Sequence, residues 1–288
     1  MFGKVSRFLA TLVVVAFALY GAHWLWIYYR VDPWTRDGRV RADIVQVTPD
    51  VSGLVAEVSV RDNQLVHVGD TLFVIDRERF RLALLQADAV VENRRATWEQ
   101  AVRDMDRYNK LDDVAVTKQR QEQTTAAAAE AEAAYKQAQA DRDFAKLNLD
   151  RSLVKASVDG IIANLDLRPG DYVTAGRPVF PLVDINSIHV QGYFEETKLP
   201  RISLGDKVKV QLMGERRILT GHVESIAPAI EDRERTPAPN LLANINPTFN
   251  WIRLAQRIPV RIALDEKPPG ILLIMGRTAN VEIIPSDH

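Results

Sequence analysis

The chain of 288 residues is 47 % hydrophobic and 26 % charged, a globular composition that is long enough for two or three compact modules. Its 37 Lys and Arg residues nearly balance 38 Asp and Glu residues, and this net charge of −1 gives no electrostatic reason to expect a nucleic-acid partner. The absence of cysteine excludes disulfides, thiolate chemistry, Cys-based metal sites and a lipid-modified N-terminal Cys.

An apolar stretch from Phe8 to Tyr29 contains no Lys, Arg, Asp or Glu. As a helix it spans about 33 Å at ~1.5 Å per residue, which crosses a bilayer. A cleaved signal peptide is the alternative, but its apolar region has only ~7 to 15 residues, and this stretch ends in an aromatic belt that includes Trp24 and Trp26. We predict an uncleaved signal anchor whose N-terminus is cytoplasmic, because Lys4 and Arg7 precede it, and whose remaining chain is periplasmic.

Residues 32–43 form a polar linker that becomes a strand at Val40, and a repeat follows. The two copies of the repeat are offset by 107 residues. The offset aligns seven identical residues of the first copy with the second, namely Val47, Val51, Gly53, Ala56, Val66, Gly69 and Phe73 with Val154, Val158, Gly160, Ala163, Val173, Gly176 and Phe180. Each copy has short alternating strands between turns. Gly53 and Gly160 are predicted at equivalent turns that tolerate a positive φ, and Gly69 and Gly176 follow the second turn. Two such halves predict one flattened β-sandwich of lipoyl or biotinyl type.

Between the halves lies a predicted antiparallel coiled-coil hairpin at residues 77–150. Its first arm carries Phe80, Leu84, Ala87, Val91, Arg94, Trp98, Ala101, Met105 and Tyr108 at coiled-coil spacing, and its second arm carries Ala128, Ala131, Tyr135, Ala138, Arg142, Ala145 and Leu149. One Arg interrupts each seam. Arms of about 35 residues predict a rod of ~50 Å, which is longer than a compact domain would bury.

The chain ends in a predicted small β-barrel with a long loop at residues 231–250. The fold class is therefore mainly β with a long helical hairpin and an N-terminal transmembrane helix. The predicted modules are residues 1–31 (anchor), 32–43 (linker), 44–76 plus 151–184 (split lipoyl-like domain), 77–150 (hairpin) and 185–288 (barrel).

This order of modules resembles the periplasmic adaptor, or membrane fusion (HlyD-like), proteins of bacterial efflux and secretion systems, whose lipoyl domain is split by a helical hairpin. Residues 32–43, 194–199 and 251–262 are similar to the p-hydroxybenzoic acid group of these adaptors. The resemblance implies a subunit of a tripartite efflux pump, with an inner-membrane transporter and an outer-membrane channel as partners. It also implies a homo-oligomeric ring, a hexamer, and aromatic carboxylic acids as exported substrates.

Adaptors of this family commonly carry an Arg, a Leu and a hydroxyl residue around the hairpin tip, where they fit the channel. Arg107, Leu111 and Thr117 match this pattern, although the interval from Leu to hydroxyl is one residue shorter than in many adaptors. Two structural explanations compete with docking. Leu111 can close the coiled-coil seam, and the hydroxyl of Thr117 can cap the second helix.

Two alternative functions remain open from the sequence. One is an adaptor for a multidrug or polypeptide exporter. The other is a membrane-anchored biotin or lipoate carrier, which is disfavoured because the insertion occupies the place of the modified Lys and no Glu-x-Met-Lys-Met-like segment exists. The five His residues have no metal-ligand spacing, and no nucleophile or phosphate-loop motif is present. We therefore predict no enzyme, no catalytic residue, no cofactor and no metal.

Overall fold

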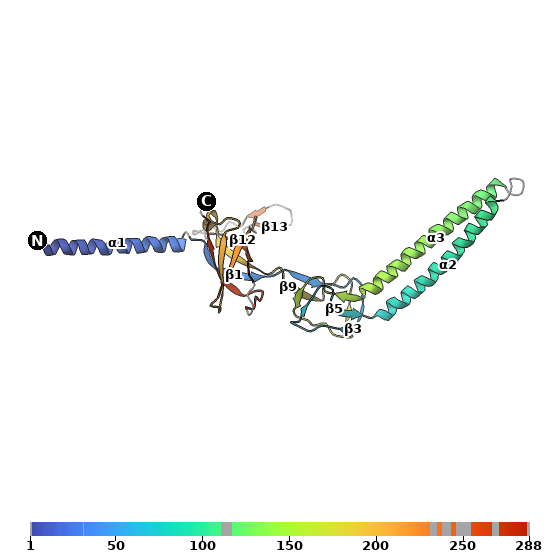
Figure 1. Cartoon of the computed structure of the whole chain (residues 1–288), viewed down its shortest axis with the longest axis horizontal. Coiled ribbons are helices and arrows are strands. Elements are labelled where there is room, and N and C mark those ends of the chain that lie inside the picture. The colour runs from blue at the N-terminus through green and yellow to red at the C-terminus, as the bar shows by residue number, and fades with distance from the viewer. Residues whose placement is uncertain are drawn as a thin grey trace. The chain divides into compact units, whose positions relative to one another are not determined.

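A computed structural model describes residues 2–30, 32–110, 117–230, 235–237, 243–245, 255–266 and 271–286. It divides into two compact units, Met1–Asp43 with Ser187–His288, and Ile44–Asn186 (Figure 1). The second unit is thus one continuous segment, inserted between the two segments that form the first unit. Mainly β structure with a helical hairpin is confirmed.

The first element is helix α1 (Phe2–Arg30), which contains the predicted anchor stretch. Its large apolar side chains between Leu12 and Trp26 are exposed. In the described part of the chain, no helix combines the length and the apolar character that a membrane crossing requires.

The rest of the first unit is a closed six-stranded barrel, which confirms the predicted barrel. Its strands, in spatial order, are β1 (Trp34–Arg41), β10 (His189–Glu195), β15 (Arg257–Leu264), β12 (Ile218–Ile226), β11 (Lys207–Leu212) and β16 (Thr278–Ile284). Alternate residues point inward, as in β11, where Val208, Val210 and Leu212 are buried. A 3-10 helix η1 (Glu196–Arg201) follows β10, and a small pair of strands, β13 (Arg235–Pro237) and β14 (Ala243–Ile245), lies within the predicted long loop.

The second unit contains two four-stranded antiparallel sheets packed around one core. The strands are β2 (Ile44–Val47), β3 (Gly53–Val58), β4 (Leu65–Val66), β5 (Thr71–Ile75), β6 (Leu153–Lys155), β7 (Gly160–Ile162), β8 (Tyr172–Val173) and β9 (Phe180–Asp184). One sheet has the order β2-β9-β7-β4 and the other β6-β5-β3-β8. Each sheet therefore mixes strands from before and after the hairpin.

The mixing follows the sequence repeat. The offset of 107 residues relates the strands of one sheet to those of the other: β2 to β6, β9 to β5, β7 to β3 and β4 to β8. The two sheets therefore have the same strand order under the repeat. Equivalent apolar residues are buried together in one core, and the rings of Phe73 and Phe180 meet edge to face with centroids 6.1 Å apart. The predicted two halves thus fold as one domain.

The turn glycines behave in two ways. Gly69 and Gly176 have φ values of +92° and +76°, which favour glycine. Gly53 and Gly160, where a positive φ would be tolerated, are the first residues of β3 and β7, and neither has a positive φ. Close packing explains them instead, since a Cβ on Gly160 would lie 2.6 Å from the carbonyl oxygen of Val183, and one on Gly53 would be similarly crowded.

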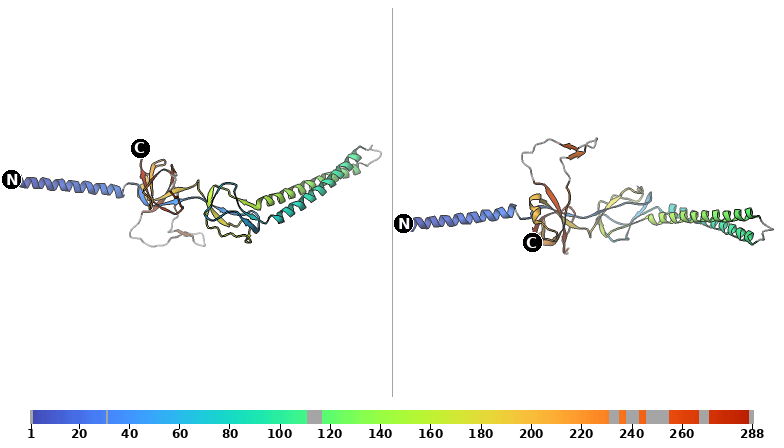
Figure 2. Two further views of the ribbon diagram at one scale, coloured as in Figure 1. Left: turned by 60° about the horizontal axis from the view of Figure 1, so that its bottom comes forward. Right: turned by 90° about the horizontal axis from the view of Figure 1, so that it is seen from above.

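Helices α2 (Arg77–Asn109) and α3 (Lys118–Arg151) form the hairpin and lie side by side in both views of Figure 2. The predicted seam residues are the less exposed ones, with Val91, Ala128 and Ala138 buried, whereas Arg94 is exposed. Trp98 of α2 stacks on Tyr135 of α3, with ring centroids 5.3 Å apart and planes 10° from parallel. The coiled-coil seam is confirmed over the described residues.

The two helices start differently. The Asp76 side chain accepts a hydrogen bond from the backbone N–H of Glu78 at 3.1 Å and caps α2. Thr117 occupies the same position before α3, but its hydroxyl makes no capping hydrogen bond, so the predicted capping role is wrong. Only the Thr117 backbone carbonyl contributes, by accepting from the N–H groups of Arg120 and Gln121.

We predict that Gly160→Ala destabilises the chain by about 1–3 kcal/mol, because its Cβ meets a carbonyl of the facing strand that cannot move without disturbing the sheet. Gly53→Ala is the matched control at the equivalent position. Its Cβ meets a methyl group of Ile75 at 2.7 Å, which a side-chain shift can relieve, so a smaller loss is expected. Denaturant unfolding measures both, and a Gly160→Ala variant as stable as the parent would refute the close-packing explanation.

Candidate functional site

The hairpin tip is the first candidate surface. Arg107 lies in the last turn of α2, is exposed, and pairs with Asp104, with Nη1 and Oδ1 3.5 Å apart. Thr117 is exposed immediately before α3. These two predicted residues therefore flank the tip at adjoining helix ends, whereas Leu111 lies outside the described residues. Near the tip, the guanidinium of Arg120 lies over the Tyr108 ring, 5.6 Å from its centroid.

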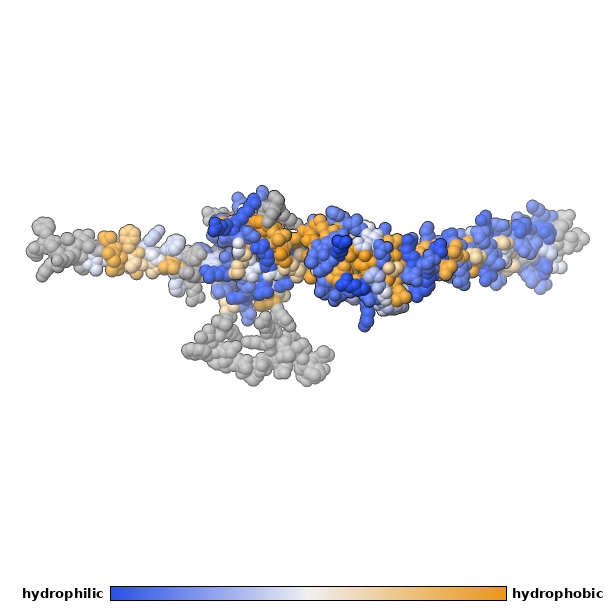
Figure 3. All heavy atoms as spheres, turned by 90° about the horizontal axis from the view of Figure 1, so that it is seen from below, coloured by the Kyte–Doolittle hydropathy of each residue, from blue (hydrophilic) through white to orange (hydrophobic). Residues whose placement is uncertain are grey.

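The second candidate is an apolar row on the outer face of the sheet β2-β9-β7-β4. Strand register places Leu65 opposite Ile161, Ile161 opposite Val183, and Val183 opposite Ile44. We call these four residues the apolar stripe. Three of them, Ile44, Ile161 and Leu65, are 40–49 % exposed, and Figure 3 shows apolar residues gathered on the surface of this domain.

The equivalent outer positions of the other sheet carry different chemistry. By the repeat, the apolar stripe corresponds to Arg151, Asp76, Leu54 and Tyr172. Leu54 and Tyr172 face each other across β3 and β8 and are 52 % and 63 % exposed. The sandwich therefore presents two different apolar patches on its two outer faces. Sequence reasoning missed both, because strand alternation alone does not tell which face is covered.

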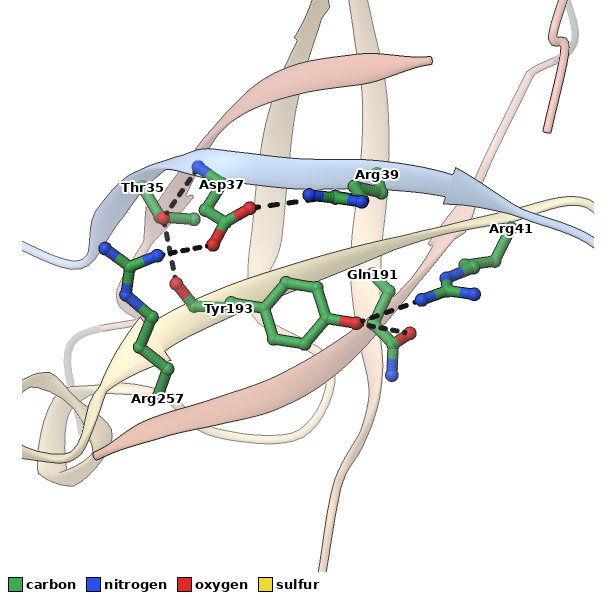
Figure 4. Close-up of polar contacts among 7 residues, drawn as sticks. All are labelled: Thr35, Asp37, Arg39, Arg41, Gln191, Tyr193 and Arg257. Atoms are coloured by element: carbon green, nitrogen blue, oxygen red, sulfur yellow. Dashed lines mark hydrogen bonds and ion pairs between the residues drawn. The ribbon is translucent and has the colours of Figure 1, made fainter. Parts of the chain in front are cut away.

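The third candidate is a polar cluster on the barrel, shown in Figure 4. Asp37 of β1 forms an ion pair with Arg257 of β15, and Arg39 lies 3.9 Å from the same carboxylate. The Thr35 hydroxyl donates to the carbonyl of Tyr193 at 2.8 Å and accepts from the N–H of Asp37. The cluster ties β1 to its neighbour β10 and to β15, the strand beyond β10 in the barrel.

Arg41 extends this cluster along β1. Its Nη2 donates to the Tyr193 hydroxyl, which donates in turn to Gln191, each at 3.3 Å (Figure 4). Its Nε is buried and has no hydrogen-bond partner among the described atoms. With Arg39 and Arg257 against the single Asp37, the cluster carries excess positive charge and favours an anionic partner.

A buried lysine fixes the edge of the barrel. Lys198 of η1 is 7 % exposed, its Nζ donates to the carbonyl of Trp34 at 3.1 Å, and it lies 5.0 Å from the centroid of the Trp34 ring. Burial lowers the pKa of Lys198, and the charges of Glu195 and Asp32 oppose that shift. The contact holds the predicted 194–199 segment against β1, and no sequence pattern signalled it.

A half-open groove of about 430 Å³ runs along the outside of β1, β16 and β11. Its lining includes Trp34, Arg36, Lys209, Gln211 and Asn280. Within the described ranges, no three His, Cys, Asp or Glu side chains are placed to hold a metal ion.

Two family models match this chain between residues 43 and 284. Residues 43–185 match the family model described as "RND MFP, barrel-sandwich hybrid domain", which corresponds to the second unit. Residues 187–284 match the model described as "AAEA-like beta-barrel domain".

A relative from Escherichia coli (strain K12), described as uncharacterized protein YdhJ, is 37 % identical over 280 residues, which cover 97 % of this chain and 98 % of the relative. The fold is similar to that of the membrane fusion protein Spr0693 from Streptococcus pneumoniae R6, with a TM-score of 0.65, 17 % identity and coverage of 87 % of this chain and 98 % of that one.

The fold is also similar to that of a MacA–MexA chimera that contains the Pseudomonas aeruginosa MexA α-hairpin domain. The TM-score is 0.62, the identity is 21 %, and the match covers 90 % of this chain and 83 % of that one. These solved structures support the fold. Family membership is established by the two family models together with the 37 % identical relative. The chain belongs to the membrane fusion protein family.

Proposed function

We propose that the protein is the periplasmic adaptor of a tripartite efflux pump and links an inner-membrane transporter to an outer-membrane channel. The main support for this proposal is the helical hairpin. Its two paired helices, of 33 and 34 residues, extend from the adjacent strands β5 and β6 of the sandwich and form a rod of ~50 Å. Such a rod adds little to the core of the sandwich. We therefore infer that its function is to contact a partner at a distance from the sandwich. A carrier of biotin or lipoate has no use for that reach, because it needs an exposed modified Lys at a short turn.

The same proposal places α1 in the inner membrane as a single span with a cytoplasmic N-terminus. Support comes from the uncharged run between Phe8 and Tyr29, from Lys4 and Arg7 before it, and from exposed apolar side chains along the helix. The barrel, the sandwich and the hairpin then lie in the periplasm. The excess positive charge of the Asp37 cluster makes it the proposed contact for the transporter.

We propose that Arg107, Leu111 and Thr117, at the hairpin tip, dock into the outer-membrane channel. Arg107 and Thr117 are exposed, as docking requires. Because the Thr117 hydroxyl makes no capping bond, it is free of the structural role that competed with docking.

The proposed substrates are aromatic carboxylic acids. The support is the similarity of residues 32–43, 194–199 and 251–262 to the p-hydroxybenzoic acid adaptors. Residues 194–199 and 251–262 lie inside the barrel segment that matches the AAEA-like family model. An adaptor of a multidrug or polypeptide exporter is the alternative, and export measurements with each substrate class distinguish the two.

We predict that Leu111→Ser abolishes p-hydroxybenzoate export from cells while the protein level and thermal stability stay unchanged, since a tip side chain contributes little to the core. Leu82→Ser, at a 61 % exposed leucine on the hairpin shaft, is the control and retains export. A Leu111→Ser variant that unfolds earlier yet exports normally at matched protein level would assign Leu111 to the seam instead.

We also propose that copies of the chain assemble into a ring, a hexamer by family resemblance. The sandwich exposes two different apolar patches on opposite faces, the apolar stripe and the Leu54–Tyr172 pair. Different patches on opposite faces suit a head-to-tail contact, which closes into a ring when the rotation allows. In this proposal the stripe of one copy packs on the Leu54–Tyr172 pair of the next.

We predict that Ile161→Glu breaks the ring into monomers, because it places a charge in a contact that excludes water. Ile161→Val keeps the stripe apolar and retains the ring, which makes it the matched control. Light scattering of the detergent-solubilised full chain measures the mass. If Ile161→Glu leaves the mass of the oligomer unchanged, the stripe is not the contact between copies.

A further inference from the structure

One rim of the barrel gathers apolar and basic side chains at the place where the chain arrives from α1. Trp34 begins β1 there, Ile284 ends β16, Lys207 begins β11, and Arg201 and Leu204 lie just before β11. We call these five residues the anchor-side rim.

Backbone pairing and an ion pair bring elements of this rim together. Lys207 lies opposite Ile284 in register, and the N–H of Ile283 donates to the carbonyl of Pro33 at 2.9 Å. Arg201 lies 3.7 Å from the carboxylate of Asp32. These contacts place the end of β16, the start of β11 and Arg201 around the start of β1.

Leu204 is the member that folding alone does not explain. It is 70 % exposed at a turn whose next residue, Gly205, has a φ of +86°. The turn is rigidly built, because the buried carboxylate of Asp206 accepts from the N–H of Ser203 at 2.8 Å and from the hydroxyl of Ser286 at 2.6 Å. The fold thus holds a large apolar side chain outward.

Basic groups flank the apolar members. Lys207 lies on the outer face of β11 and forms no ion pair within the described residues. Arg36 lies over the Trp34 ring, 5.5 Å from its centroid. Of the nearby carboxylates, Asp32 is paired with Arg201, and Glu282 lies opposite Lys209 in register. The combination of an aromatic ring, aliphatic side chains and lysine or arginine is typical of membrane–water interfaces.

The covalent chain keeps this rim near the end of α1. Four Cα-to-Cα steps separate Arg30 from Trp34, and at ~3.8 Å per step Trp34 lies within about 15 Å of Arg30. If α1 is the membrane anchor, Arg30 is at the outer membrane interface. The rim then lies within reach of the lipid headgroups.

We propose that the anchor-side rim rests on the outer surface of the inner membrane, with Leu204 and Ile284 among the upper acyl chains and Lys207 and Arg36 at anionic phospholipid headgroups. This inference rests on the proposed anchor. It adds a second membrane contact, which fixes the orientation of the barrel that a single helix and a short linker leave free.

The test uses the natural absence of cysteine from the chain. Leu204→Cys in the full-length protein, labelled with an environment-sensitive dye, is reconstituted into vesicles of phosphatidylglycerol and phosphatidylethanolamine that carry a quencher on the upper acyl chain. We expect a blue-shifted emission that the quencher suppresses. Added Lys207→Glu is expected to reduce that suppression.

Met213→Cys is the matched control, because Met213 is 68 % exposed, precedes Gly214 at a φ of +86°, and follows the other end of β11. Its label is expected to stay in water and unquenched. Equal quenching at both sites, or none at Leu204, overturns the proposal and leaves a protein partner as the occupant of the rim.

Alkaline extraction of the same vesicles tests the anchor separately. A protein that resists extraction but shows no quenching at Leu204 retains the anchor and loses the rim contact. A protein that is extracted loses the anchor, and the inference falls with it.

Discussion

The exchange of strands between the two halves of the sandwich is the constraint on which the rest of the structure depends. Neither half completes a sheet, because β2 and β4 need β9 and β7, and β6 and β8 need β5 and β3. The shared core, centred on the Phe73–Phe180 contact, forms only when both halves are present. Burying that apolar surface offsets the entropic cost of closing a chain loop that contains the whole hairpin.

The same exchange fixes the root of the hairpin. Strands β5 and β6 are neighbours, so the end of one half and the start of the other lie side by side, and the N–H of Ile75 donates to the carbonyl of Ser152 at 2.9 Å. Helices α2 and α3 must therefore leave the sheet as an adjacent antiparallel pair. The Trp98–Tyr135 stack and small alanines then keep the pair together along its length. The proposed reach toward a channel is a direct consequence of how the sandwich is closed.

Much of this fold could be predicted from the sequence, because its signals are periodic. The offset of 107 residues, the coiled-coil seam and the alternating strands of the barrel each repeat a physical pattern several times. Single contacts were not predictable. The crowding at Gly160 depends on a facing strand, the burial of Lys198 on the path of η1, and the uncapped hydroxyl of Thr117 on local backbone geometry. The apolar stripe required the register between strands that are distant in sequence.

A disulfide between Leu54→Cys and Tyr172→Cys tests the exchanged sandwich most directly. These residues come from different halves, lie opposite each other across β3 and β8, and directly opposed strand residues are about 4.5–5.5 Å apart, which a disulfide spans. With a protease site inserted at residues 111–116, the strand exchange predicts that the cut, oxidised chain runs as one species on a denaturing gel and that reductant separates it into two fragments. Fragments that separate without reductant, or cysteines that pair only between chains, would contradict it.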